Sequence, residues 1–249
     1  MVSIFGFGEP LIDKGIVEKV EYCSDMGLRT FITTNGALLD IDLTSKLIEA
    51  GLTRIRFSVH GVTQDSYETV HRGLKFKDTT RNIFNFLKIN DVKYGGACRA
   101  DASTIPMMDS LEDVRSFWTR KIDNFEVWKP HNWVDGEEFR ELSQVRKKTC
   151  GRPSDGPIQI NWDGKVMVCC FDYDAKMTVG DTTTDSLESI ILGDAFNEIR
   201  ARHDFEDLKG LPCETCDQLN TGEKPLLYST MDDGSEWKFS STKIKLKEI

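Results

Sequence analysis

The chain has 249 residues, a formal net charge of −9 and 39% hydrophobic residues. This length suits one large domain or two small ones, and no apolar run approaches the roughly 18 residues of a transmembrane helix. The negative charge excludes an extended nucleic-acid-binding surface, because phosphate contacts need concentrated Lys and Arg. The N-terminus shows no targeting signal, so we expect a cytoplasmic protein with neither nucleic-acid nor membrane partners.

Strand and helix signals alternate over residues 1–146. Apolar or β-branched runs predict strands at residues 2–7, 29–34, 54–59, 94–100 and 125–129. Helically spaced apolar residues predict helices around residues 12–26, 43–48, 83–87 and 111–121. This repeated order indicates parallel strands joined by helical crossovers. About five strands are too few to close an eight-stranded barrel.

The pattern changes after Cys150. Residues 158–160 and 166–168 alternate around Asp163-Gly164, which predicts a β-hairpin. A helix is predicted over 186–200, and the polar composition of 221–249 predicts an irregular tail. The expected division is therefore a barrel part at 1–146, a small domain at 147–220 and a tail at 221–249.

The cysteines of the second half form a set of soft metal ligands. They are Cys150, the adjacent Cys169 and Cys170, and Cys213 with Cys216 in a C-x-x-C. Without a secretion signal, such a set is more typical of a metal site in a reducing compartment than of disulfides. Four thiolates from three segments suit an iron–sulfur cluster or zinc, and the cysteine spacing by itself favours the two metals equally.

Motifs at the ends of the predicted strands, taken with the cysteines, resemble a known family. In chain order they are Gly8-Glu9-Pro10, Thr34-Asn35-Gly36, Ser58-Val59-His60-Gly61 with Tyr67, and His71-Arg72-Gly73. Their order and spacing resemble radical S-adenosylmethionine (SAM) enzymes. The second half is similar to the SPASM/twitch extension of these enzymes, through Cys150, the hairpin glycine Gly164 before Cys169, Gly180-Asp181, and Cys213 to Cys216.

The resemblance implies an α/β fold and a radical chemistry. The fold is a partial (β/α) radical SAM barrel, without its first strand and cluster loop, followed by a small twitch or SPASM domain. SAM and a [4Fe–4S] cluster would generate a 5′-deoxyadenosyl radical that abstracts hydrogen from a small-molecule or peptide substrate. An auxiliary [4Fe–4S] cluster would take part in electron transfer, as in an oxidoreductase or maturase, with a flavodoxin or ferredoxin as reductant.

The resemblance also assigns residues to SAM. Glu9 and its neighbours would fix the methionine ammonium, since a buried cation needs acceptors, and Arg99 would pair with the carboxylate. The expected cofactor-binding residues are Gly8, Glu9, Pro10, Asn35, Ser58 and Arg99. Each has a structural alternative as a turn residue, a strand-end residue or a surface salt bridge.

The positions of other polar residues near predicted strand ends make them candidates for the active site. His60 and Asp101 are candidate catalytic residues, with a structural histidine as the alternative for His60. His131 and Trp133 are candidates for lining a substrate pocket. The sequence identifies no catalytic acid or base beyond these candidates.

The expected cluster ligands are Cys150, Cys169, Cys213 and Cys216. Within the adjacent pair, Cys169 matches the twitch position when counted from Gly164. Adjacent residues on a strand point to opposite faces, so Cys170 is expected to be a buried neighbour. Four well-placed cysteines are fewer than a full SPASM domain carries, which favours one auxiliary cluster.

One defining motif of the family is missing from the sequence. The chain contains no C-x-x-x-C-x-x-C, the motif that in the family holds the cluster to which SAM binds. We therefore expect an N-terminally truncated sequence, with the chain inactive as it stands. The alternative is a non-catalytic module that binds an iron–sulfur cluster or zinc.

Overall fold

The computed structural model describes residues 1–105, 107–130, 145–220 and 226–230. The described residues form two compact units, one of residues 1–129 with 226–230 and the other of residue 130 with 145–220. No helix within these described ranges is both long enough and apolar enough to cross a membrane.

A six-stranded sheet forms the centre of the first unit. Its strands, in spatial order, are β1 (Val2–Ser3), β2 (Thr30–Thr34), β3 (Arg54–Ser58), β4 (Arg99–Thr104), β5 (Asn124–Trp128) and β9 (Leu226–Ser229). The first five strands are parallel, and β9 pairs antiparallel with β5. The parallel order predicted from the alternation of strands and helices is therefore confirmed.

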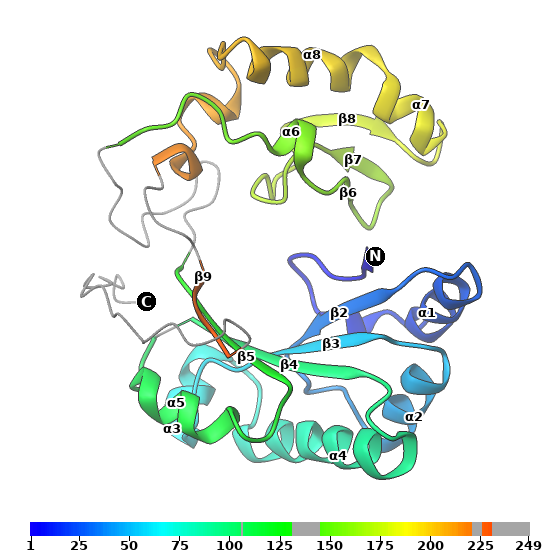
Figure 1. Ribbon diagram of the computed structural model, residues 1–249, viewed down its shortest axis with the longest axis vertical. Helices are drawn as coiled ribbons and strands as arrows, with labels where there is room; N and C mark the ends of the chain where they lie inside the picture. The colour runs from blue at the N-terminus through cyan, green and yellow to red at the C-terminus, as the bar shows by residue number, and fades with distance from the viewer. Residues whose placement is uncertain (106, 131–144, 221–225, 231–249) are drawn as a thin grey trace. The chain divides into compact units, whose positions relative to one another are not determined.

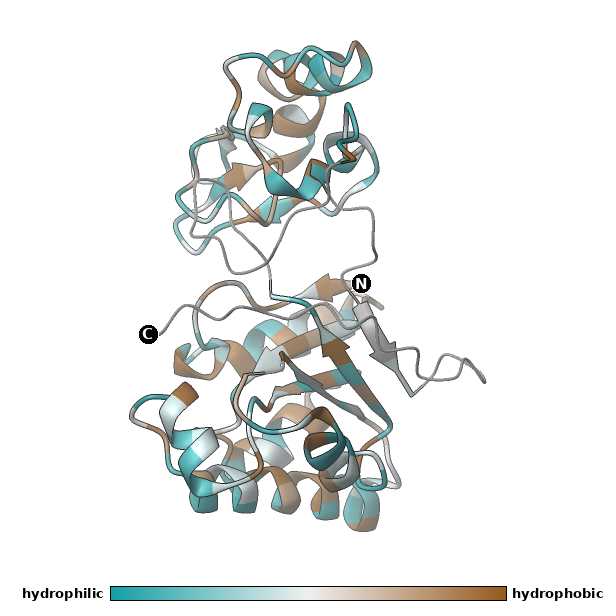
Figure 2. Ribbon diagram, turned by 90° about the vertical axis from the view of Figure 1, so that its left-hand side faces the viewer, coloured by the Kyte–Doolittle hydropathy of each residue, from teal (hydrophilic) through white to brown (hydrophobic). Residues whose placement is uncertain are grey.

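Helices connect the parallel strands and cover one face of the sheet (Figure 1). They are the 3₁₀ turn η1 (Pro10–Ile12), α1 (Ile16–Asp25), α2 (Ile41–Glu49), α3 (Gln64–Val70), α4 (Phe76–Tyr94) and α5 (Leu111–Trp118). On β3, Ile55 and Phe57 are fully buried on this side, and the Phe57 ring meets Phe86 of α4 edge-on at 5.6 Å. In Figure 2, brown apolar stretches alternate with white and teal ones along the strands.

The second unit contains a small three-stranded sheet and short helices. The strands β6 (Gln159–Ile160), β7 (Lys165–Met167) and β8 (Thr178–Asp181) pair antiparallel. The predicted hairpin is confirmed, and Gly164 takes the left-handed conformation of its turn, with φ +87°. The helical elements are α6 (Arg152–Asp155), α7 (Leu187–Leu192), α8 (Asp194–Asp204), η2 (Pro212–Glu214) and η3 (Asp217–Asn220).

Three predicted elements differ from the structure. The strand expected at 2–7 extends only over Val2–Ser3. The strand expected at 94–100 begins only at Arg99, because α4 continues to Tyr94 and Gly95 and Gly96 both turn with positive φ. The helix expected over 186–200 is divided at Gly193 into α7 and α8.

The predicted division into a barrel part, a small domain and a tail also changes at the C-terminal end. Residues 226–229 are not part of an irregular tail, because β9 pairs with the edge strand β5 and satisfies its backbone groups. Residues 131–144, around the expected boundary at 146, and residues 221–225 and 231–249 lie outside the described ranges.

Candidate functional site

Glu9 holds together the loop after β1 and the end of β2. Its Oε1 accepts hydrogen bonds from the Leu11 amide at 3.0 Å and the Thr34 hydroxyl at 2.6 Å, and its Oε2 accepts one from the Asn35 amide at 2.8 Å. All three donors are neutral, so they orient the carboxylate without neutralising its charge. The Glu9 carboxylate is therefore fixed at the carboxyl edge of the parallel sheet, where it can receive a cationic group.

The turn after β2 lies beside this carboxylate and is closely packed. Asn35 Oδ1 accepts a hydrogen bond from the Ala37 amide at 2.8 Å, and Gly36 has φ +78°. A Cβ on Gly36 would lie 3.0 Å from Ile83 Cγ1 of α4, so a side chain there meets both strain and contact. The structure thus brings Glu9 and Asn35 together, with Gly8 and Pro10 on either side of Glu9.

The ends of β3 and β4 meet through Ser58 and His60. Ser58 is aligned with Ser103 of β4, and His60 Nδ1 accepts the Ile105 amide at 3.0 Å. The His60 ring stacks on His71 at 5.1 Å. Burial lowers the pKa of His60 to about 3, and the neighbouring His71 adds to the shift. A neutral ring that accepts a backbone hydrogen bond is suited to joining two strands.

Arg99 and Asp101 lie on β4 but away from this edge. Arg99 is the first residue of β4, four residues before Ser103, which is about 13 Å along a strand. Its Nε donates to Asp101 Oδ1 at 2.8 Å, and Arg54 Nε donates to Asp101 Oδ2 at 2.5 Å. The structure therefore does not bring Arg99 to Glu9, and both oxygens of the buried Asp101 accept from guanidinium groups.

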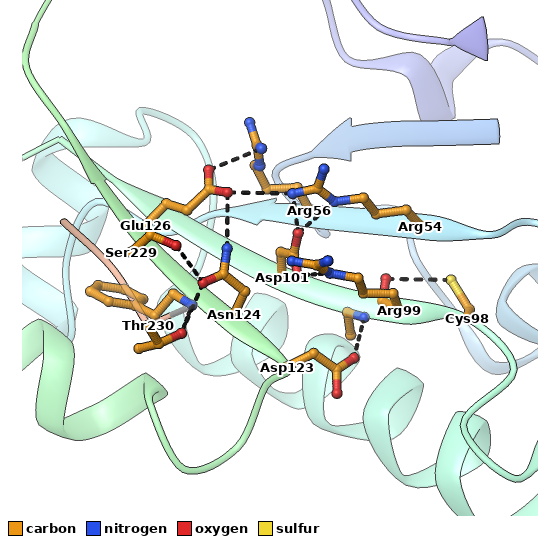
Figure 3. A network of polar contacts seen from close by, with 12 residues as sticks. Arg54, Arg56, Cys98, Arg99, Asp101, Asp123, Asn124, Glu126, Ser229 and Thr230 are labelled. Carbon is orange, nitrogen blue, oxygen red and sulfur yellow. Dashed lines mark hydrogen bonds and ion pairs between the residues drawn. The ribbon is translucent and has the colours of Figure 1, made fainter. Parts of the chain in front are cut away.

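Arg54, Asp101 and Arg99 belong to a larger charged network on the helix-free face of the sheet (Figure 3). Glu126 of β5 pairs with Arg56 at 2.9 Å and with Arg54 at 3.3 Å. It also accepts hydrogen bonds from Asn124 and from the Trp128 indole, both at 2.9 Å. These side chains order the open face of three adjacent strands.

Sequence reasoning missed this network, although a signal was present. Parallel strands are usually apolar on both faces, yet Arg54 to Ser58 and Asn124 to Trp128 alternate polar with apolar residues. The alternation indicates a second, polar face. His131 and Trp133, predicted to line a substrate pocket, lie outside the described residues.

In the second unit, the four expected ligand cysteines line one pocket. The pocket has about 400 Å³ of free space, part of it open to solvent. Its cysteines are Cys150, Cys169, Cys213 and Cys216. They come from the segment before α6, the turn after β7, and η2 with the residues that follow it. The tertiary structure thus gathers the predicted set.

Cys170 differs from its neighbour Cys169. Cys170 does not line the pocket, and its Sγ accepts a hydrogen bond from Arg152 Nη1 at 3.3 Å. Cys169 lines the pocket, and its Sγ accepts the Phe171 amide at 3.4 Å, an arrangement typical of cluster-ligating sulfurs. Both follow the last residue of β7, Met167, so they lie in a turn rather than on the strand.

Burial favours the neutral forms of the pocket thiols. The pKa of Cys213 is raised to about 12, mainly by burial and also by neighbouring Cys150 and Cys216. Burial also raises the pKa of Cys216. A bound metal centre favours the thiolate forms of such ligands and reverses this trend.

The four cysteines line one pocket together, and in a cubane cluster each thiolate binds a different iron. Within the described part of the chain, no three His, Cys, Asp or Glu side chains converge closely enough to hold one metal ion.

His203 and Met177 are among the other pocket-lining residues that sequence reasoning did not select. His203, at the end of α8, is 1% exposed, and Met177 is 4% exposed with its Sδ 3.6 Å from Cys213 Sγ. Neither residue stands in a motif or at a recognisable spacing from the cysteines. No signal in the sequence would have found them.

Comparison with known families matches both units. Residues 2–95 match the radical SAM superfamily, and residues 150–217 match SPASM, an iron–sulfur cluster-binding domain. The chain belongs to the radical SAM superfamily and carries a SPASM domain. These domains imply SAM and [4Fe–4S] clusters as cofactors, and the edge with Glu9 lies in the radical SAM domain while the cysteine pocket lies in the SPASM domain.

Curated relatives match part of the chain. The chain is 30% identical over 143 residues to GTP 3′,8-cyclase of Alkaliphilus oremlandii, which is 53% of this chain and 44% of that protein. It is 34% identical over 97 residues to PqqA peptide cyclase of Bradyrhizobium diazoefficiens, which is 36% of this chain and 26% of that protein. The chain thus spans less than half the length of these relatives.

A solved structure shares the fold across both domains. SuiB of Streptococcus suis has been solved bound to SAM and bound to the precursor peptide SuiA. It aligns with 88% of this chain, with a TM-score of 0.60 and 16% identity, and the alignment covers 60% and 59% of the two SuiB chains. The fold of most of this chain is therefore shared with SuiB.

Proposed function

We propose that this chain carries out part of a radical SAM reaction on a peptide or small-molecule substrate, with an auxiliary [4Fe–4S] cluster in electron transfer. The observation that carries the proposal is the gathering of Cys150, Cys169, Cys213 and Cys216 around one pocket. The match of that segment to an iron–sulfur cluster-binding domain supports it.

In this proposal the two domains hold different groups. The four pocket cysteines bind the auxiliary cluster as thiolates. In the radical SAM domain, the Glu9 carboxylate accepts the methionine ammonium of SAM, and Asn35 and Ser58 stand at the same sheet edge. When bound with its own cluster, SAM supplies the 5′-deoxyadenosyl radical that abstracts a substrate hydrogen, and the auxiliary cluster offers a route for the remaining electron.

The net charge of the chain and the names of its relatives support a peptide or small-molecule substrate. The net charge of −9 disfavours a nucleic-acid substrate. PqqA peptide cyclase is named for a peptide, and SuiB has been solved with a precursor peptide bound. An oxidative modification of a peptide or small molecule, with a flavodoxin or ferredoxin as electron donor, fits these observations and an auxiliary cluster.

Reconstitution of the full chain tests the cluster. Loaded anaerobically with iron and sulfide, it should bind about four irons and four sulfides and gain charge-transfer absorption in the visible range. The variant Cys23→Ser, which removes a partly exposed thiol of α1, should bind the same amount and serves as control. Stoichiometric zinc without visible absorption after reconstitution would refute the assignment.

A non-catalytic metal-binding role is the second candidate. One observation favours it: the 249 residues contain no C-x-x-x-C-x-x-C. This role requires the auxiliary site but no SAM-binding edge. SAM binding by isothermal calorimetry separates the two, because only the catalytic role predicts that Glu9→Gln weakens binding.

A further inference from the structure

His203 carries a buried hydrogen-bonding group that the proposed cluster site does not yet use. The side chain lines the cysteine pocket and is 1% exposed. Its Nε2 is buried and has no hydrogen-bond partner among the described residues. A buried polar atom without a partner costs stability, so an acceptor or donor in the pocket would remove this cost.

Thr149 is the partner of the other ring nitrogen of His203. The Thr149 Oγ1 lies 2.8 Å from His203 Nδ1 and accepts the Gly151 amide at 3.2 Å. This hydroxyl can donate to Nδ1. In that tautomer the ring proton lies on Nε2, which makes the buried, unpartnered atom a donor.

We propose that His203 is a positioning residue whose Nε2–H donates a hydrogen bond to a sulfur of the cluster bound by the four pocket cysteines. This inference rests on the proposed function, because it requires that cluster. Sulfur is the acceptor that a thiolate-held cluster presents to its surroundings, and hydrogen bonds to the sulfurs tune its reduction potential.

The expected effect has a definite sign. Reduction adds negative charge to the cluster, and a hydrogen bond donated to its sulfur stabilises that charge. Loss of the donor therefore lowers the reduction potential. The Phe171 amide already donates to Cys169 Sγ, and His203 adds a side-chain donor that a substitution can remove.

Redox titration of the reconstituted full chain, followed by electron paramagnetic resonance, tests this role. His203→Phe should bind the same iron and show about a tenfold smaller equilibrium constant for reduction, which is about 59 mV for one electron. His203→Gln retains an N–H donor and should stay near the wild-type potential. His71→Phe removes a histidine from the radical SAM domain and should not change it.

Two outcomes would overturn the inference, and they differ from failure of the cluster assignment. If iron-loaded His203→Phe has the wild-type reduction potential, His203 does not donate a hydrogen bond to the cluster, although the cluster itself is present. Pulsed measurement of the reduced wild-type chain labelled with ¹⁵N-histidine should show a nitrogen coupling that disappears in His203→Gln. Its absence would also overturn the inference, even if His203→Phe does not fold. No iron in the wild type refutes the proposed function instead.

Discussion

Cys169 and Cys170 are adjacent in the chain, but only Cys169 lines the cysteine pocket. Cys169 lines the pocket and accepts a backbone amide, whereas Cys170 accepts the Arg152 guanidinium and does not line it. Two adjacent and identical side chains therefore have different partners besides each other. The difference comes from the turn after β7, which begins before either cysteine.

Replacing each of these two cysteines with serine should show which of them binds the cluster. We expect Cys169→Ser to lose most of its iron after reconstitution, because serine is a poor ligand for iron in a thiolate set. Cys170→Ser should retain about four irons. Iron and sulfide analysis of both variants measures this, and the reverse result would assign the ligand to Cys170.

His60 makes the radical SAM domain sensitive to acid. Its pKa is lowered to about 3 in the folded protein, from 6.5, mainly by burial. Between these values the unfolded chain binds a proton that the folded chain does not, so stability rises with pH in this window and falls as the pH drops. The ring accepts the Ile105 amide only while Nδ1 is unprotonated.

Replacing His60 with asparagine should reduce this sensitivity. His60→Asn keeps an acceptor without a titrating group, so its unfolding free energy should vary less with pH between about 6.5 and 4. The slope should decrease by up to about 1.4 kcal/mol per pH unit. Urea unfolding at several pH values measures it. Parallel slopes for the variant and the wild type would show that folded His60 takes up the proton.

At the scale of elements, two contacts between distant segments complete the domains. Strand β9 covers the edge of β5, where the Ser229 and Thr230 hydroxyls both donate to Asn124 Oδ1. In the SPASM domain, α7 packs directly on β8 at Gly180, where a Cβ would lie 2.6 Å from Ile190 Cγ2. Ile190 is buried, so it has little room to move.

The close approach of α7 to β8 predicts that Gly180→Ala destabilises the SPASM domain. We expect a loss of about 1–3 kcal/mol from overpacking, measured by urea unfolding. In Ile190→Ala the same glycine change should cost at least about 1 kcal/mol less, because the clashing atoms are gone. Gly6→Ala, where a Cβ meets nothing within 4 Å, is the control. Equal costs in both backgrounds would contradict the packing argument.

At the scale of the whole molecule, the chain combines a sheet edge that we propose binds SAM with a cysteine pocket that we propose binds an auxiliary cluster, but its 249 residues contain no C-x-x-x-C-x-x-C. In radical SAM enzymes, that motif holds the cluster that donates the electron to SAM. In the proposed function all four pocket cysteines are ligands of the auxiliary cluster, so they do not replace that motif. We therefore expect that binding of SAM and its reductive cleavage can be measured as separate properties of these 249 residues.

We expect this chain, reconstituted and reduced with dithionite, to form no 5′-deoxyadenosine from SAM. Chromatography with mass spectrometry measures the product against a control without protein. As a positive control, a radical SAM activase of known activity is added to the chain. Because the activase forms the product by itself, product in this control shows that the assay conditions support cleavage. Product from this chain alone would mean that another set of its cysteines holds a SAM-binding cluster.

The sequence by itself determined the features that depend on local pattern. Alternating strand and helix signals predicted the parallel sheet, and Asp163-Gly164 predicted the hairpin. These predictions are confirmed because periodicity and turn residues act within a few residues. The glycines with positive φ that precede β4 also act locally. They delay the start of this strand relative to the predicted one, and that effect was not predicted.

Only the tertiary structure decided which distant groups meet. It placed Arg99 beside Asp101 at the far end of β4 and away from Glu9, paired β9 with β5 across about a hundred residues, and set His203 among the cysteines. Register, edge pairing and pocket lining depend on how whole elements pack, because the free energy of burial rewards contacts irrespective of their separation in sequence. No local pattern specifies those partners.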